Sequence, residues 1–207
     1  MEGFTPWPKE FADKYRKAGY WLDRTISEVM DETFSKYSLR TALIASDGRS
    51  FTYKELGSLV TRLALHMVNL GISKYDRLIL QMPNIPEVVI TYLAALKAGA
   101  IPIMALFAHR EAEISFFAEL SQARAVAIAS TWKGFDYQEM MAQVQARNPH
   151  LETILVAGGD ARKGYYSIDA MLQDPIEESV SPINLPKPDP NLPAVLLLSG
   201  GTTGIPK

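Results

Sequence analysis

Short apolar runs alternate with helix-length segments through residues 41–158. The runs "RLILQM", "AIPIMAL", "AVAIAS" and "TILVAG" have the length and composition of strands that are buried on both faces. The segments that we expect to be helices cover residues 56–68, 88–96, 109–120 and 137–146, and the first two carry apolar residues three and four positions apart. This alternation predicts βαβ units, and therefore an α/β fold in which a mostly parallel sheet has helices on both faces.

Local signals mark the ends of two of these helices. Thr52 and Glu55 form the S/T-x-x-E pattern of a capping box before the first helix, and Gly71 suits the turn that ends it. Asn84 is the N-cap candidate of the second helix, with Pro86 in its first turn.

The alternation divides the chain into four regions. Residues 1–40 are expected to form peripheral helices, within "KEFADKYRKAGYW" and "TISEVMDETFSKY", and residues 41–172 the α/β core. Residues 173–192 contain five prolines among acidic and small residues, which predicts an extended connector. Residues 193–207 begin with another buried strand, "PAVLLLS". We expect this strand to belong to a truncated second subdomain, to pair with a sheet mostly absent from this chain, and to be poorly anchored.

Composition excludes several classes of protein. A net charge of −2 provides no basic face for a nucleic acid. With no cysteine, the chain has no disulfide scaffold, thiol nucleophile or cysteine-based zinc site. The N-terminus lacks the basic and apolar regions of a secretory signal, and the most apolar stretch is interrupted by Lys97, Gly99 and Pro102. We therefore expect a cytoplasmic protein that does not span a membrane.

The segment that follows the last strand has the chemistry of a phosphate-binding loop. Its glycines let backbone N–H groups approach an anion, its hydroxyls add hydrogen-bond donors, and its lysine adds a positive charge. The candidate ligands of the ATP phosphates are Ser199, Gly200, Gly201, Thr202, Thr203, Gly204 and Lys207. The segment is not the common P-loop, because Lys207 lies three residues after Gly204 with Pro206 between them. An ordinary glycine-rich turn is the alternative.

Three motifs in order carry a resemblance to the adenylate-forming superfamily of acyl- and aryl-AMP ligases. "LSGGTTGIPK" resembles its phosphate loop, "FTYKEL" its first core motif and "LKAGAIPIMAL" its second. The segments "GFTPWPKEFADKYRKAGYW", "NIPEVVITYLAALKAGAIPIMAL" and "AHREAEISFFAE" resemble the aryl-acid AMP ligases of siderophore synthesis, most closely 2,3-dihydroxybenzoate–AMP ligase. The chain resembles the N-terminal part of such an enzyme's large domain.

The resemblance implies a reaction and its participants. An aryl acid similar to 2,3-dihydroxybenzoate attacks the α-phosphate of ATP in the presence of Mg²⁺, and an aryl-adenylate and pyrophosphate are formed. The aryl group then passes to the phosphopantetheine thiol of an aryl carrier protein. Salicylate, another benzoate or a CoA ligase reaction are alternatives within this class. A non-catalytic, degenerate paralogue that acts as a binding module is an alternative of another class.

In the superfamily, the adenine-binding segments, the acid pocket, the acidic residue that helps to place Mg²⁺ and the catalytic lysine lie beyond the phosphate loop. We therefore expect no catalytic residue and no metal ligand in this chain, and no adenylation by the chain alone. We also expect a terminal carboxylate on Lys207, whose charge would offset the attraction of this lysine to phosphate. His66 is expected to be a packed or surface helix residue, His109 a loop or capping residue, and His150 an exposed turn residue.

Overall fold

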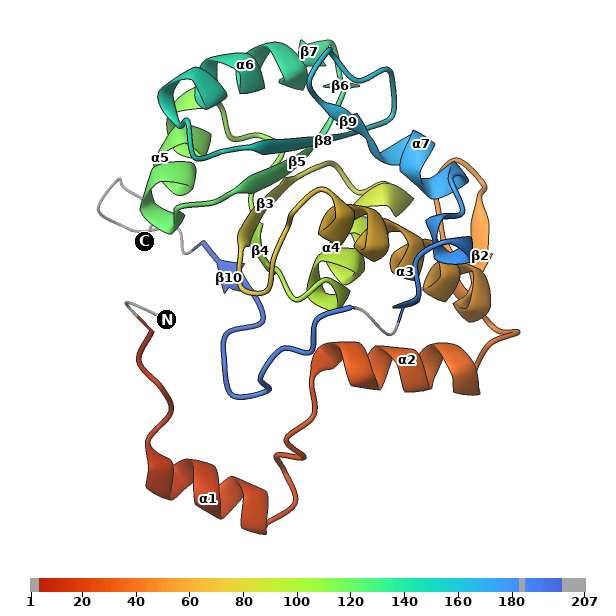
Figure 1. Ribbon diagram of the computed structural model, residues 1–207, viewed down its shortest axis with the longest axis vertical. Coiled ribbons are helices and arrows are strands. Elements are labelled where there is room, and N and C mark those ends of the chain that lie inside the picture. The colour runs from red at the N-terminus through yellow and green to blue at the C-terminus, as the bar shows by residue number, and fades with distance from the viewer. Residues whose placement is uncertain (1–3, 183–184, 199–207) are drawn as a thin grey trace.

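The computed structural model describes residues 4–182 and 185–198, and in them the expected α/β architecture is confirmed (Figure 1). A parallel sheet of six strands has the order β10-β4-β3-β5-β8-β9 within this part of the chain. Its strands are β3 (Arg77–Gln81), β4 (Ile101–Met104), β5 (Ala125–Ala129), β8 (Thr153–Ala157), β9 (Tyr166–Ser167) and β10 (Leu196–Leu197).

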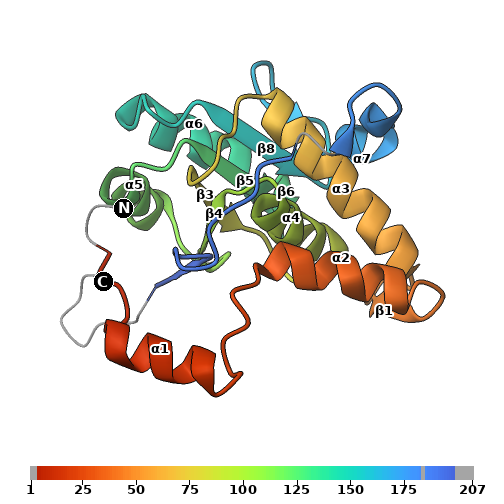
Figure 2. The same cartoon turned by 60° about the horizontal axis from the view of Figure 1, so that its bottom comes forward.

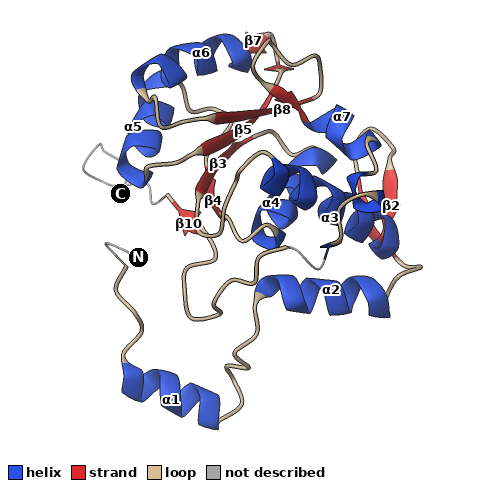
Figure 3. Ribbon diagram, viewed as in Figure 1, coloured by secondary structure: helices blue, strands red, loops and turns tan. Residues whose placement is uncertain are grey.

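Helices cover both faces of this sheet (Figure 3). One face packs against α3 (Tyr53–Asn69), α4 (Pro86–Lys97) and α7 (Ile168–Gln173), and the other packs against α5 (Glu111–Ser121) and α6 (Tyr137–Arg147). The turned view in Figure 2 separates these two groups of helices. Successive strand residues alternate between the two layers: Leu78 and Leu80 face α3 and α4, whereas Ile79 faces α5 and α6. Burial on both faces explains why the strands are apolar at nearly every position.

The remaining elements lie around this core. The helices α1 (Lys9–Lys17) and α2 (Ile26–Lys36) precede it, and the short 3-10 helix η1 (Ile176–Glu178) follows α7. Two antiparallel hairpins stand outside the main sheet. They are β1 (Thr41–Ile44) with β2 (Ser50–Thr52), and β6 (Thr131–Trp132) with β7 (Phe135–Asp136). No helix in residues 4–182 and 185–198 is long and apolar enough to cross a membrane.

The predicted start of α3 is confirmed. For α4, Pro86 lies in the first turn as predicted, but the prediction of Asn84 as the N-cap is wrong. The Thr52 side chain accepts a hydrogen bond from the Glu55 N–H, and the Glu55 carboxylate accepts one from the Thr52 N–H. Gly71 follows α3 with a φ of +87°, a left-handed conformation that glycine adopts without steric cost. The N-cap of α4 is Ile85, without a side-chain hydrogen bond, because the fixed φ of Pro86 starts this helix.

The expectation for the last strand is also corrected. Instead of pairing with a sheet outside the chain, β10 extends the main sheet beside β4, with Leu196 opposite Ile103 and Leu197 opposite Met104. Leu196 and Leu198 pack against the α5 and α6 side of the core, whereas Leu197 is 73% exposed. The outer edge of β4 was available because the helix that follows β4 leads to β5, on the far side of β3.

The proline-rich connector is held against the core at several points. The Arg62 guanidinium of α3 forms hydrogen bonds with both carboxylate oxygens of Glu177, 2.6 to 3.1 Å apart. The Tyr75 hydroxyl accepts a hydrogen bond from the Asp189 N–H at 3.1 Å. The described parts of the connector are therefore attached to the core on both sides of residues 183–184.

We expect Thr52→Ala to lower the free energy of unfolding by about 1 kcal/mol, since it removes an N-cap from a helix that buries eight residues. Chemical denaturation measures this change. Thr25→Ala is the matched control, because Thr25 makes the same capping box at α2, a helix without buried residues. An equal loss of global stability in the two variants would contradict the assignment of α3 to the cooperative core.

Acid is expected to release the connector from α3. The hydrogen bond from Arg62 lowers the pKa of Glu177 below its ordinary value. A carboxylate with a lowered folded pKa stabilises the protein fully above its unfolded pKa, and this contribution is lost as the pH falls through the folded pKa. Proteolysis within residues 174–182 should therefore accelerate below the ordinary pKa of glutamate.

Glu177→Gln should raise this cleavage rate at neutral pH and flatten its pH dependence. Glu178→Gln is the control, because Glu178 does not share the hydrogen bonds of Glu177 to Arg62. Identical pH profiles for the wild type and Glu177→Gln would show that another group controls the release.

Candidate functional site

The carboxyl ends of the parallel strands meet at one edge of the sheet, and we locate the candidate site there. Numbered along the chain from β3, the five strands β4-β3-β5-β8-β9 stand in the order 2-1-3-4-5. The chain reverses its direction of growth at β3, since β4 lies on one side of it and β5 on the other. In sheets of this topology, ligands bind in the crevice outside the carboxyl ends at the point of reversal.

Gln81 is the last residue of β3 and lies at this point of reversal. Its side chain is fully buried, on the side of the sheet that faces α5 and α6. The Nε2 group donates hydrogen bonds to the carbonyl oxygens of Leu106 at 3.1 Å and His109 at 2.9 Å. Gln81 therefore connects β3 to the turn that follows β4.

The turn at residues 106–109 is exposed over most of its length and yet closely held. The His109 N–H donates to the Leu106 carbonyl at 3.0 Å, and the Leu106 N–H donates to Nδ1 of His109 at 3.2 Å. Two further side chains bind the Phe107 carbonyl: the Tyr137 hydroxyl at 2.7 Å and the Arg110 guanidinium at 3.0 Å. The carbonyl groups of this turn are thus fixed by side chains from three other positions in the chain.

The start of α5 adds to this arrangement. Glu113 accepts a hydrogen bond from the Arg110 N–H at 2.9 Å, and this bond lowers the pKa of the Glu113 carboxyl. The Arg110 guanidinium lies 4.0 Å from the centre of the Phe135 ring, a cation–π distance. Helix α5 therefore begins at a defined position directly after the turn.

A second turn at the same edge is held by Gln138 of α6. Its Nε2 donates to Ser130 Oγ and to the Asp160 carbonyl, each at 2.9 Å, and its Oε1 accepts from the Arg162 N–H at 2.9 Å. The neighbouring Gly159 has a φ of +155°, and a Cβ there would lie 3.0 Å from Ser130 Oγ. This turn at residues 158–162 is therefore closely packed.

The predicted phosphate ligands Ser199, Gly200, Gly201, Thr202, Thr203, Gly204 and Lys207 lie outside the described residues. The structure does describe the strand that leads to them. Because β10 runs parallel to β4, its carboxyl end lies at the same edge of the sheet as the turn held by Gln81. The sequence did not predict the roles of Gln81, Tyr137 and Gln138 in holding the turns at this edge. A glutamine inside the apolar run "RLILQM" was the available signal for the first of these.

Each of the three histidines contacts a backbone carbonyl or an aromatic ring of the fold. Nε2 of His66 lies 3.1 Å from the Asp174 carbonyl in a buried position, which agrees with the expected packed residue. His109 is a turn residue, as expected, with its ring against Phe117. His150 was expected to be exposed, but it is half-buried, with Nε2 3.0 Å from the Ala118 carbonyl. In the described ranges, no group of three His, Asp or Glu side chains is arranged to hold a metal.

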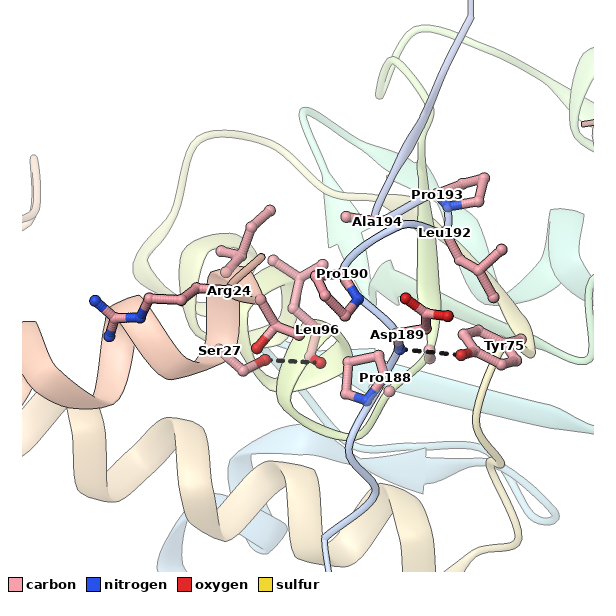
Figure 4. Close-up of a pocket in the computed structure, with 14 residues that line it drawn as sticks. Arg24, Ser27, Tyr75, Leu96, Pro188, Asp189, Pro190, Leu192, Pro193 and Ala194 are labelled. Atoms are coloured by element: carbon pink, nitrogen blue, oxygen red, sulfur yellow. Dashed lines mark hydrogen bonds between the residues drawn. The ribbon is translucent and has the colours of Figure 1, made fainter. Parts of the chain in front are cut away.

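A hollow of about 80 Å³ lies at the opposite, amino edge of the sheet (Figure 4). It is enclosed by residues 24–27 at the start of α2, the turn before β4, and residues 188–194 at the end of the connector and just after it. Its polar groups already form hydrogen bonds, from Ser27 Oγ to the Leu96 carbonyl and from the Asp189 N–H to Tyr75 (Figure 4). The volume is well below that of a usual ligand pocket, so we interpret the hollow as a packing gap beneath the connector.

The strand order and its reversal at β3 define a doubly wound α/β fold, a class in which ligands bind outside the carboxyl ends at the point of reversal. The chain belongs to the AMP-binding enzyme family, whose sequence model matches residues 30–207.

Individual relatives agree with this assignment. The chain is 37% identical over its full length to a 2,3-dihydroxybenzoate-AMP ligase of Bacillus subtilis, and 37% identical to a salicyl-AMP ligase / salicyl-S-ArCP synthetase of Mycobacterium tuberculosis. It spans 36% of the length of each of these relatives. The structure is similar to the apo structure of Mycobacterium smegmatis MbtA, with a TM-score of 0.86 and 37% identity, over 99% of this chain and 37% of that one.

Leu196→Ala is expected to loosen β10, since it removes a side chain that packs against the core. The predicted loss is about 1–2 kcal/mol of unfolding free energy, with faster amide exchange at residues 196–198. Hydrogen–deuterium exchange measures this effect. Leu197→Ala is the matched control, and equal effects of the two substitutions would contradict the described position of β10.

Proposed function

We propose that this chain forms the first part of an aryl-acid adenylating ligase and supplies its initial contacts to the phosphates of ATP. The observation that carries this proposal is the position of β10. The strand belongs to the core sheet, ends at its carboxyl edge, and is followed directly by the S-G-G-T-T-G-x-P-K motif. Membership of the AMP-binding enzyme family supports the same function.

The proposed reaction overcomes the low reactivity of a carboxylate. The acid's oxygen attacks the α-phosphate of ATP and displaces pyrophosphate, so that a mixed anhydride with a good leaving group is formed. The phosphopantetheine thiol of a carrier protein then loses its proton and attacks the carbonyl carbon of this anhydride, so that a thioester forms and AMP is released. The protein accelerates such a reaction mainly by positioning the reactants and stabilising phosphate charge.

The residues of the motif have different proposed roles in binding and stabilising the phosphates. The hydroxyls of Ser199, Thr202 and Thr203 and the amides of the glycines bind the β- and γ-phosphates, and Lys207 stabilises the departing pyrophosphate. Mg²⁺ is proposed to act with the nucleotide, as the resemblance to the adenylate-forming superfamily implies. We place the reaction in the cytoplasm, where ATP and carrier proteins are available.

The acid is proposed to resemble 2,3-dihydroxybenzoate, because the segments at residues 3–21, 84–106 and 108–119 resemble ligases for that acid. Salicylate is the second candidate, because a relative named for salicyl transfer is equally identical to this chain. Both relatives extend well beyond the matched segment, and the proposed acid pocket belongs to the part that follows.

A chimera tests the proposal. Residues 1–207 are joined to the part of the Bacillus subtilis ligase that follows its matched segment, and ATP–pyrophosphate exchange is measured with 2,3-dihydroxybenzoate, salicylate and benzoate. We expect exchange by the chimera, with the acid preference of the donor ligase, and none by residues 1–207 alone. Thr202→Val in the chimera should reduce the rate at least about tenfold by removing a phosphate contact.

Thr41→Val is the control, because Thr41 lies in the β1–β2 hairpin outside the main sheet. ATP–pyrophosphate exchange catalysed by residues 1–207 alone would contradict the proposal that the acid pocket belongs to the part of the ligase that follows. A folded chimera that is inactive with every acid would favour the non-catalytic binding module.

A further inference from the structure

Gln81 is a polar side chain at a position where the fold by itself would favour an apolar one. It is fully buried, it follows the apolar residues Leu78, Ile79 and Leu80, and it is paired in register with Ile128 of β5. Burying an amide costs free energy unless each of its polar atoms has a partner. The hydrogen bonds of Gln81 can therefore be accounted for atom by atom.

The Nε2 group uses both of its hydrogens, on the Leu106 and His109 carbonyl oxygens. These two acceptors fix the orientation of the amide, because a reversed amide would place its oxygen against two carbonyl oxygens. The remaining atom, Oε1, is buried and has no hydrogen-bond donor among residues 4–182 and 185–198. An acceptor at the point of strand reversal is thus left unused by the described fold.

Gln138 provides the comparison within the same edge of the sheet. It is buried like Gln81, and its Nε2 also donates two hydrogen bonds, one of them to a turn carbonyl. Its Oε1, however, accepts from the Arg162 N–H, so the amide is fully satisfied by the fold. Both Nε2 and Oε1 of Gln138 thus have partners, whereas Oε1 of Gln81 has none among the described residues.

We propose that Gln81 is a positioning residue of the adenylation site. Its Nε2 holds the turn at residues 106–109 beside the end of β10, and its Oε1 accepts a hydrogen bond from an N–H or O–H group of a bound substrate. The donor is either a group of ATP or a ring hydroxyl of the aryl acid. The inference rests on the proposed function, because it assigns the substrates of that site.

The first arm of the test concerns the turn and uses the 207-residue chain. Gln81→Met keeps the length of the side chain but removes both hydrogen bonds to the turn. Hydrogen–deuterium exchange at residues 106–109 should become at least about fivefold faster, with residues 158–162 unchanged. Gln138→Met should produce the opposite pattern. Unchanged exchange at residues 106–109 in Gln81→Met would overturn the positioning role.

The second arm concerns the substrate and uses the chimera. Calorimetry measures the affinities for ATP–Mg²⁺ and 2,3-dihydroxybenzoate separately, so it does not depend on turnover. Gln81→Met should weaken one of the two about five- to tenfold, as expected for one lost hydrogen bond, and Gln138→Met should weaken neither. The weakened ligand identifies the donor. Unchanged affinity for both would reduce Gln81 to a structural residue and overturn the second half of the proposal.

Gln81→Glu separates a chemical role from simple loss of packing. Burial against two carbonyl oxygens should raise the pKa of the introduced carboxyl, so that it is protonated in mild acid and can donate one hydrogen bond. Affinity in this variant should therefore recover as the pH falls, whereas Gln81→Met should show no such recovery. Parallel pH profiles for the two variants would count against the proposal.

The outcomes also distinguish this inference from the proposed function. If the chimera without substitutions binds both ligands but does not catalyse ATP–pyrophosphate exchange, the proposed reaction is rejected. The affinities of the Gln81→Met chimera for the two ligands would then still test the role of Gln81. A folded chimera that binds neither ligand would reject both.

Discussion

Burial of the parallel sheet on both faces is the constraint on which the rest of the structure depends. Because helices cover both faces, the interior positions of β3, β5 and β8 are apolar, and polar chemistry is confined to the strand ends. Parallel direction then brings all the carboxyl ends to one edge. The buried glutamines Gln81 and Gln138 both lie near this edge, and the side chain of each forms hydrogen bonds with backbone groups of a turn.

The two edges of the sheet have different roles as a result. At the carboxyl edge, the turn at residues 106–109 is exposed, but side chains from β3, the N-cap of α5 and α6 bind three of its carbonyl groups. Such preorganisation suits a reaction that depends on positioning rather than on a protein nucleophile. At the amino edge, the connector covers the starts of β3 and β4, through Asp189 on Tyr75 and Pro186 near Gly99.

The position of β10 unites these observations with the family assignment. Helix α7 directly follows β9 at one edge of the sheet, whereas β10 forms the opposite edge. Between them, the described parts of the connector contact α3 and Tyr75. The motif that follows β10 therefore starts from the same sheet that carries Gln81 and the turn at residues 106–109. The strand that leads to the proposed phosphate site thus belongs to the same sheet as Gln81, although Gln81 lies more than a hundred residues before the motif.

Local physical chemistry made much of this predictable from the sequence alone. Apolar runs with both faces buried predicted the strands, helical periodicity and the Thr52–Glu55 capping box predicted α3, and the ordered motifs predicted the family. Sequence did not predict the partner of β10, because a strand reached through a proline-rich connector lacks the helical crossover that links neighbouring parallel strands. Nor did it predict the roles of Gln81 and Tyr137, since each binds a backbone carbonyl at least 25 residues away. Only the packing of β3, β4 and α6 brings those donors to a single turn.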